Sequence, residues 1–230
     1  MSDHDASYWG KIKRLIDLTR KQTLLDVGAN VGLVTERLYR EYPESAIYSF
    51  EPVPSAFEIL QSKFSTYSNV TLINLGLWDG TGEIDFEVHN DTATSSPYPR
   101  NISGRKYYST YDKIVETISV KVESLDHWTT KAGIKHIDFI KMDTQGSELM
   151  ILSGAKNLLY KNSIDIIYTE FFLVPHYQDA PLLNDLWSIL SDSGYSMFDI
   201  FKGPYANNGQ LRFGDAIFIS DRFRNTILDS

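Results

Sequence analysis

Short apolar runs alternate along this chain with longer segments that carry apolar residues at helical spacing. Thr23–Val27 is mostly apolar and ends at a glycine, which is typical of a buried parallel strand. Residues 31–41 follow with Val31, Val34 and Leu38 on one face, which predicts a helix. The remaining strands are predicted at Ala46–Phe50, Val70–Asn74, Ile137–Met142, Ile164–Thr169, Tyr195–Ile200 and Ala216–Ser220, and the remaining helices at 8–20, 54–64, 147–160 and 181–193.

This alternation of strand and helix predicts an α/β fold. It implies a mostly parallel seven-stranded sheet with helices on both faces. Right-handed crossovers then bring the carboxyl ends of the parallel strands to one edge, where ligands bind in open α/β sheets. A length of 230 residues suits one domain with a full core. We therefore expect a single domain over residues 1–230, with residues 1–21 as an N-terminal helical extension.

Residues 79–130 interrupt the alternation, because they are long for a connection between two strands. Glu83–His89 alternates like a strand, and Ser119–Val122 is a candidate for another. Asn90–Tyr111 is rich in Ser, Thr, Tyr, Pro and Gly, so it predicts an extended loop, either a functional lid or a disordered insertion. Three tyrosines favour a lid that faces the substrate, and they are Tyr107, Tyr108 and Tyr111.

Composition and charge narrow the function classes. The chain has no cysteine, which excludes disulfides, thiolate zinc sites and cysteine nucleophiles, and suits a cytoplasmic location. No apolar run reaches the roughly 18 residues that a membrane span needs, and no signal-peptide pattern is present. A formal net charge of −8 works against binding along a phosphate backbone, so we expect no nucleic-acid partner. The oligomeric state stays open.

The turn after the first strand carries the clearest chemical signal. A strand that ends in glycines and opens a helix brings backbone N–H groups and the helix N-terminus close to a ligand. Gly28 and Gly32 allow close backbone approach because they lack a Cβ, and Asn30 tolerates unusual φ values. Glu51 ends the second strand, 23 residues after Gly28, where a carboxylate can accept hydrogen bonds from both ribose hydroxyls of a nucleoside.

The spacing within this turn separates dinucleotides from other nucleosides. A dinucleotide fingerprint needs G-x-G-x-x-G, and the series Gly28, Asn30, Gly32 lacks its second glycine and the correctly spaced third. Asp26 stands at the end of the first strand. A carboxylate there suits a ligand with an ammonium and a sulfonium better than one with phosphates. The turn therefore favours S-adenosylmethionine as the cofactor.

Several segments together resemble the FkbM family of methyltransferases. They are Asp26–Gly32, Phe50–Pro54, Ile137–Glu148, Thr169–Phe172 with Pro175–Tyr177, and Asp215–Phe218. The resemblance runs from about residue 22 to residue 220, and the set of motifs is specific where any one alone is weak. It implies a class I methyltransferase (Rossmann-like) fold, S-adenosylmethionine as methyl donor, and O-methylation, often of sugar hydroxyls or secondary metabolites.

The same resemblance implies which residues contact the cofactor. The residues around its methionine part would be Asp26, Gly28, Asn30 and Gly32. Glu51 would hold the ribose. The residues near the adenine, at the end of the third strand, would be Asn74, Leu75 and Gly76. The chain departs from the residues common in the family at Gly76, where alanine is usual, at Gln145, where an acid is usual, and at His176, where leucine is usual.

Three residues are candidates for the chemistry. Methyl transfer to an alcohol needs alignment of the partners and removal of a proton. Asp143 closes the fourth strand, where it can bind the cofactor, position the acceptor, act as base or cap the next helix. Glu170 ends an apolar strand, so its carboxylate must be paired, solvated by a cleft or given a raised pKa. His176 offers an imidazole, a natural base for this step, although a lone histidine is more often structural.

These candidates leave several functions open. Asp143, Glu170 and His176 could together bind a divalent ion, but no ligand spacing demands one, and we predict no metal site. The leading expectation is an S-adenosylmethionine-dependent O-methyltransferase whose substrate is a small molecule or glycan, first of all a sugar or glycoconjugate hydroxyl. The alternatives are a methyltransferase of a polyketide-like metabolite, a non-catalytic S-adenosylmethionine-binding module, and a nucleotide-dependent dehydrogenase.

Overall fold

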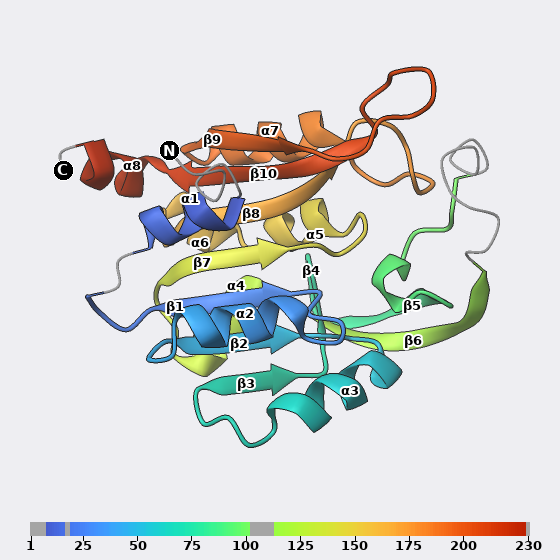
Figure 1. The fold of residues 1–230 in the computed structure, drawn as a ribbon, viewed down its shortest axis with the longest axis horizontal. Coiled ribbons are helices and arrows are strands. Elements are labelled where there is room, and N and C mark those ends of the chain that lie inside the picture. The colour runs from blue at the N-terminus through green and yellow to red at the C-terminus, as the bar shows by residue number, and fades with distance from the viewer. Residues whose placement is uncertain (1–7, 17–18, 102–112, 229–230) are drawn as a thin grey trace.

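A seven-stranded sheet forms the centre of the molecule (Figure 1). The computed structural model describes residues 8–16, 19–101 and 113–228. The strand order is β3-β2-β1-β7-β8-β10-β9, and only β10 runs antiparallel to its neighbours in this sheet. The strands are β1 (Thr23–Val27), β2 (Ala46–Phe50), β3 (Val70–Ile73), β7 (Ile137–Met142), β8 (Ile164–Phe172), β9 (Tyr195–Lys202) and β10 (Phe213–Ser220).

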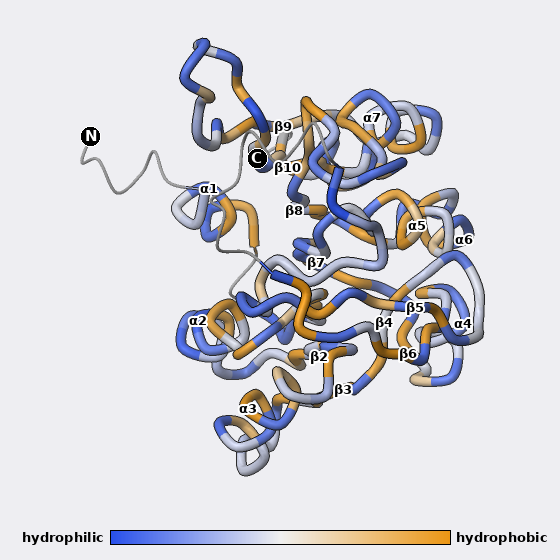
Figure 2. Tube along the Cα trace, turned by 90° about the vertical axis from the view of Figure 1, so that its right-hand side faces the viewer, coloured by the Kyte–Doolittle hydropathy of each residue, from blue (hydrophilic) through white to orange (hydrophobic). Residues whose placement is uncertain are grey.

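Helices cover both faces of this sheet, so the core has two layers (Figure 2). One layer lies under α1 (Tyr8–Leu15), α2 (Leu33–Glu41), α3 (Pro54–Phe64) and α8 (Asp221–Leu228). The other lies under α4 (Leu125–Ala132), α5 (Glu148–Ser153), α6 (Lys156–Tyr160) and α7 (Leu183–Asp192). The central strands β7 and β8 are buried along their whole length, which explains their near-continuous apolar sequence. No helix in the described part of the chain is long and apolar enough to cross a membrane.

A second, three-stranded sheet takes two of its strands from the region that interrupts the alternation. Its order is β4-β6-β5, with β6 parallel to β4 and antiparallel to β5. Its strands are β4 (Gly76–Trp78), β5 (Gly82–His89) and β6 (Ile114–Ser124). Apolar side chains of β5 and β6 pack on Val53 and Ala56, which ties this sheet to the start of α3. The tyrosines at 107, 108 and 111 lie outside the described residues.

The predicted mostly parallel seven-stranded sheet is confirmed, and so are most of its strand positions. The single helix expected at 147–160 is wrong, because the chain forms α5 and α6 with a break at Gly154. A Cβ on Gly154 would lie 2.0 Å from the carbonyl oxygen of Trp78, so the break lets the backbone pass close to β4. The sequence reading also omitted β4, α4 and α8.

Candidate functional site

A cleft opens at the carboxyl ends of β1 and β2, between the two sheets. Its volume is about 710 Å³ including the open mouth, which is in the range of small-molecule sites. The wall formed by the small sheet is apolar and consists of Leu77, Trp78, Ile84, Phe86, Val120 and Val122. Glu51 and Asp143 also line the cleft, whereas no described Lys, Arg or His does. This lining suits a nucleoside with a cationic group and disfavours one with phosphates.

Glu51 is the buried acid of this cleft. Its Oε2 accepts a hydrogen bond from the backbone N–H of Asn30 at 2.7 Å, and its Oε1 accepts one from the N–H of Val53 at 2.8 Å. Burial is the largest influence and raises the pKa of Glu51 to about 7, although both N–H groups act against the rise. Two backbone donors therefore fix the carboxylate in one orientation while each oxygen keeps a lone pair for a ligand.

The turn that presents Asn30 has left-handed backbone at Gly28 (φ 74°), Asn30 (φ 48°) and Gly32 (φ 87°). A Cβ on Gly28 would lie 2.2 Å from the carbonyl oxygen of Asp143, so this glycine lets the ends of β1 and β7 approach closely. A Cβ on Gly32 would lie 2.5 Å from the Phe64 ring. Gly28 and Asn30 line the cleft, whereas Gly32 packs against α3.

Two other residues expected near the cofactor support the cleft from behind. Asp26 is fully buried, and its Oδ2 accepts a hydrogen bond from the Thr35 hydroxyl at 2.7 Å. Asn74 donates from Nδ2 to the backbone carbonyl oxygens of Glu51 (2.8 Å) and Pro52 (3.2 Å), which holds the strand end that carries the acid. Leu75 and Gly76, which follow Asn74, do line the cleft.

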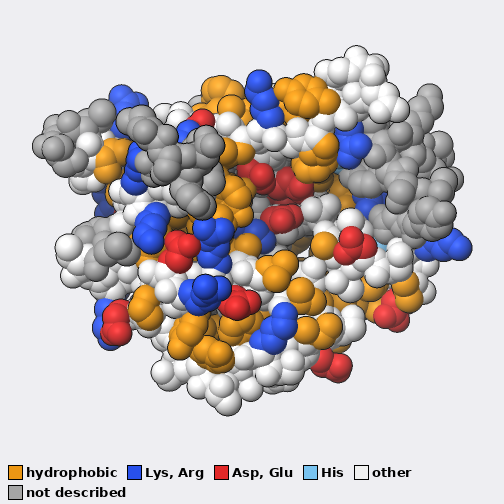
Figure 3. Space-filling model, viewed as in Figure 1, with side chains coloured by type: hydrophobic (Ala, Val, Ile, Leu, Met, Phe, Trp, Pro, Cys, Tyr) orange, Lys and Arg blue, Asp and Glu red, His pale blue; other side chains and the backbone are white. Residues whose placement is uncertain are grey.

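A group of charged side chains lies where β7 and β8 end and β10 begins. Glu170 lies on the same face of β8 as Tyr168, which packs with α1. Figure 3 shows acidic side chains gathered in a hollow near the centre of the face that carries α1, α2 and α3. The buried Lys141 donates from Nζ to the carbonyl of Gly28 at 3.1 Å and lies 3.9 Å from Asp143 Oδ2. It therefore joins the turn of residues 28–32, which we call the cofactor turn, to the group of acids.

The pKa values within this group are displaced from their ordinary range. Burial, followed by the negative charges of Asp143, Glu148 and Asp215, raises the pKa of Glu170 well above its usual value. Burial alone would lower the pKa of Lys141, but the nearby carboxylates outweigh it and raise that pKa. Burial and the neighbouring acids therefore favour the protonated form of Glu170, and the carboxylates around Lys141 favour its charged form.

Gln145 links two of the predicted catalytic residues. Its Nε2 donates to Asp143 Oδ1 and to Glu170 Oε2, both at 2.9 Å. The structure thus brings Asp143 and Glu170 to one amide group at the edge of the cleft, which Asp143 and Gln145 line. A functional role for Gln145 was not predicted from the sequence, because only the fold brings residues 143, 145 and 170 together.

His176 lies elsewhere. Its ring is fully buried, stacks on Phe172 with 4.7 Å between centroids, and meets the Phe213 ring at 5.4 Å. Burial, followed by the positive charges of Arg212 and Arg100, lowers the pKa of His176 to about 4. The imidazole is therefore neutral at pH 7, but it does not line the cleft.

The sequence analysis also missed Asp215. It pairs with Glu170 across β10 and β8, and burial raises its pKa to about 6. The signal was present, because an acid near the start of the otherwise apolar run 213–220 invites the same argument that selected Glu170.

A short segment, residues 92–96, which we call the strap, forms part of the cleft wall. It contains the 3₁₀ helix η2 (Thr92–Thr94), and Thr92, Ala93 and Ser95 line the cleft. The Thr92 hydroxyl donates to Asn30 Oδ1 at 2.9 Å, and the Ser96 hydroxyl donates to the Gln145 carbonyl at 2.8 Å. Residues 92–96 are therefore attached to both the cofactor turn and the loop after β7.

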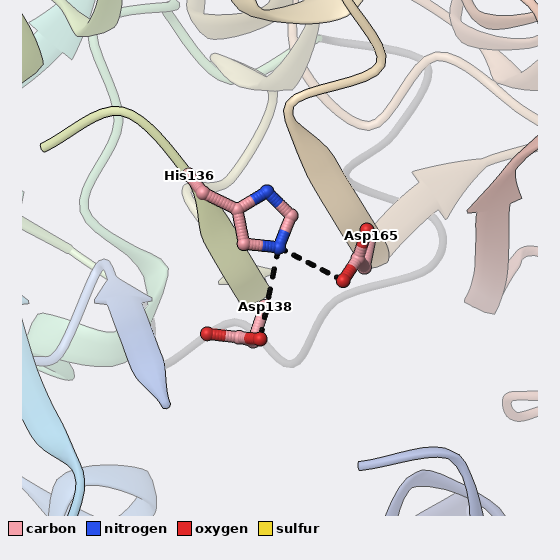
Figure 4. A group of neighbouring side chains, drawn as sticks. All are labelled: His136, Asp138 and Asp165. Atoms are coloured by element: carbon pink, nitrogen blue, oxygen red, sulfur yellow. Dashed lines mark hydrogen bonds and ion pairs between the residues drawn. The ribbon is translucent and has the colours of Figure 1, made fainter. Parts of the chain in front are cut away.

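In the described part of the chain, His136, Asp138 and Asp165 form a group whose spacing could hold a metal ion (Figure 4). They lie at the amino ends of β7 and β8, opposite the cleft. His136 Nε2 is 2.9 Å from Asp165 and 3.7 Å from Asp138. Arg222 donates to Asp165 at 2.8 Å, and Arg20 donates to Asp138. Protein cations therefore already balance both carboxylates, which favours an ion-pair network.

Comparison with known proteins agrees with this geometry. The family model described as the Methyltransferase FkbM domain matches residues 26–197. The 2-O-methyltransferase NoeI of Sinorhizobium fredii (strain NBRC 101917 / NGR234) is 30% identical over 169 residues, which cover 69% of this chain and 68% of NoeI. The hexuronic acid methyltransferase AglP of Haloferax volcanii is 26% identical over 161 residues, which cover 69% of this chain and 60% of AglP.

A solved structure agrees in fold. Magnesium protoporphyrin IX methyltransferase from Synechocystis PCC 6803, with bound S-adenosylmethionine, superposes with a TM-score of 0.50 at 11% identity, over 94% of this chain and 79% of that one. Its likeness concerns the fold alone. The FkbM match covers most of the chain, including the cofactor turn, Glu51, Asp143 and Glu170. The chain therefore belongs to the FkbM family of methyltransferases, has the class I methyltransferase fold, and takes S-adenosylmethionine as its cofactor.

Proposed function

We propose that this protein transfers a methyl group from S-adenosylmethionine to a hydroxyl of a sugar or glycoconjugate. The observation that supports this best is that Asp143, which lines the cleft together with Glu51, is linked through the Gln145 amide to Glu170. No described Lys, Arg or His lines the cleft. Two relatives support a sugar acceptor, because one is named a 2-O-methyltransferase and the other a hexuronic acid methyltransferase.

The cleft lining suggests how the cofactor would be held. Glu51, oriented by two backbone donors, would accept hydrogen bonds from the ribose hydroxyls. Leu75, Gly76 and the apolar wall of the small sheet would pack against the adenine. Gly28 and Asn30 would lie along the methionine part. In this assignment Asp26, Gly32 and Asn74 act from behind the cleft, by fixing the strand ends and the turn.

We propose that Asp143 accepts the proton of the acceptor hydroxyl. S-adenosylmethionine supplies an activated methyl group when it is bound, so the protein has to align the acceptor and take up its proton. The Asp143 side chain is 44% exposed, and with Oδ1 held by Gln145, its Oδ2 is the oxygen left for the acceptor. Glu170, whose protonated form is favoured by its burial and its acidic neighbours, would donate a hydrogen bond to the acceptor. His176 packs the loop after β8 and serves as support.

Radiolabelled S-adenosylmethionine, incubated with the protein and separate panels of neutral sugars, uronic acids and polyketide alcohols, tests this function. We expect label on a sugar hydroxyl, and a loss of about 100-fold or more in rate for Asp143→Asn, since a general base contributes about 10²–10⁴-fold. Asp192→Asn, the same change at an exposed position on α7, is the matched control and keeps the wild-type rate. Label on the polyketide panel alone contradicts the sugar acceptor, and an unimpaired Asp143→Asn contradicts the base.

A further inference from the structure

We propose that Gln145 is a positioning residue of this methyltransferase, whose carboxamide holds the carboxyl groups of Asp143 and Glu170 in one geometry at the acceptor end of the cleft. The inference rests on the proposed function, because Asp143 is the group proposed to take the proton. Gln145 Nε2 lies 2.9 Å from Asp143 Oδ1 and 2.9 Å from Glu170 Oε2. An amide nitrogen carries two hydrogens, so these two bonds use its whole donor capacity.

The surroundings favour one orientation of this amide. The hydroxyl of the fully buried Tyr177 lies 2.8 Å from Gln145 Oε1 and 3.0 Å from the carbonyl oxygen of Thr94, and can donate to either. If the amide were reversed, Oε1 would face the carboxyl oxygens of Asp143 and Glu170. At least one of these two oxygen–oxygen contacts would then have no hydrogen atom between its oxygens. The network therefore aims both amide hydrogens at the two carboxyl groups.

The backbone of the loop is also held in place. Gln145 has φ 55°, a left-handed conformation that costs a residue with a Cβ roughly 1–2 kcal/mol. The buried carboxylate of Glu148 accepts hydrogen bonds from the N–H groups of Thr144 (2.8 Å) and Gly146 (3.0 Å), one on each side. The Ser96 hydroxyl donates to the Gln145 carbonyl at 2.8 Å. A strained residue that its neighbours hold so closely points its side chain in one direction.

The Gln145 amide and the two carboxyl groups that it holds, which we call the clamp, bring two acidic groups close together. Two carboxyl groups that share one amide nitrogen lie close enough for their charges to repel, and joint ionisation is therefore unfavourable. Asp143, Glu148 and Asp215 face Glu170 with negative charge, while Lys141 opposes them. Burial and these acids raise the pKa of Glu170, which favours its protonated form and leaves the more exposed Asp143 as the group proposed to accept a proton. The amide holds an acid and a base side by side.

Carboxyl ¹³C NMR of the full-length protein tests the clamp without any acceptor. The signal of Glu170 is assigned with Glu170→Gln and followed through a pH titration in Gln145→Leu and Gln145→Glu. We expect the midpoint for Glu170 to rise by about one unit in Gln145→Leu, which loses the donor, and further in Gln145→Glu, which adds a charge. Gln178→Glu places the same charge change at an exposed position of the neighbouring loop and leaves the midpoint unchanged.

Two further measurements keep the proposal falsifiable. Tyr177→Phe removes only the hydroxyl that orients the amide, so we expect a smaller rise in the same direction, and this variant decides if the Gln145 variants do not fold. Calorimetric binding of S-adenosylhomocysteine shows which of the folded variants still form the cofactor cleft. An unchanged Glu170 midpoint in folded Gln145→Leu, or in Tyr177→Phe where that variant decides, overturns the clamp. A raised midpoint with no methyl transfer to any sugar supports the clamp and contradicts the proposed function.

Discussion

Glu51 is the single residue on which the cofactor assignment depends most. Glu51→Gln keeps the shape but removes the charge and one of the two acceptor oxygens. We expect binding of S-adenosylhomocysteine to weaken by about 10- to 100-fold, since a hydrogen bond to a charged group contributes about 1.5–3 kcal/mol. Isothermal titration calorimetry measures this directly. An exposed substitution of the same kind, Glu58→Gln on α3, is expected to leave binding unchanged, and an unchanged affinity in Glu51→Gln contradicts the ribose assignment.

The buried carboxyl of Glu51 also predicts a pH dependence of stability. Its folded pKa of about 7 lies above the ordinary value of 4.5, so the folded state binds the proton more tightly than the unfolded state. Stability therefore falls as pH rises from 4.5 to 7, by about 3 kcal/mol at most. Glu51→Gln does not titrate. Urea unfolding at pH 5 and pH 8 should show the variant gaining stability relative to wild type at the higher pH, and a constant difference contradicts the raised pKa.

Some residues of the candidate site could be predicted from the sequence, and others could not. Glu51 and Asp143 could be found because each follows a recognisable strand, and parallel strands end at a common edge. Gln145 could not, because its role depends on Glu170 and Tyr177, which are more than 20 residues away in the chain. His176 was selected for its chemistry alone, and its burial among aromatic rings is a tertiary property.

At the scale of elements, the small sheet acts as a wall of the cofactor cleft. Val122 on β6 is 3% exposed and packs with Val53 at the start of α3. We expect Val122→Ala to destabilise the protein by about 1–3 kcal/mol and to weaken S-adenosylhomocysteine binding, because it removes buried methyl groups from that wall. The matched control is Val115→Ala on the same strand, where the side chain is 65% exposed and the expected change is under about 0.5 kcal/mol. Equal losses in both variants, measured by urea unfolding, contradict this role.

The large sheet was predictable and the small one was not. Strands that are buried on both faces can be recognised in the sequence by their near-continuous apolar runs, as in β7 and β8. By contrast, β4 has three residues and pairs with β6 more than 40 residues later, so its local sequence carries little signal. The region expected as an insertion with a lid therefore contains strands that form a structural wall.

At the scale of the whole molecule, the ion-pair network around His136 connects β7 and β8 to the C-terminal helix α8 through Arg222. Hydrogen bonds to Asp138 and Asp165 raise the pKa of His136 to about 9, above its ordinary 6.5. The charged form of His136 therefore stabilises the folded state, by about 1–2 kcal/mol once screening by solvent is allowed for. This stabilisation is fully present below pH 6.5 and is lost as the pH rises through 9. Thermal melts from pH 6 to pH 9.5 should fall more steeply for wild type than for His136→Ala, and parallel curves contradict the network.

The strap of residues 92–96, which lines the cleft, has a consequence for turnover. It is joined to the cofactor turn through Thr92 and Asn30 and to the loop after β7 through Ser96 and Gln145. We expect these bonds to open when the spent cofactor leaves, and loop opening of this kind limits the rate in many enzymes. Rapid-quench experiments should therefore give a burst of about one methyl transfer per protein molecule, followed by a slower steady rate. In Ser96→Ala the burst stays and the steady rate rises, because the strap that delays departure is attached by one bond fewer.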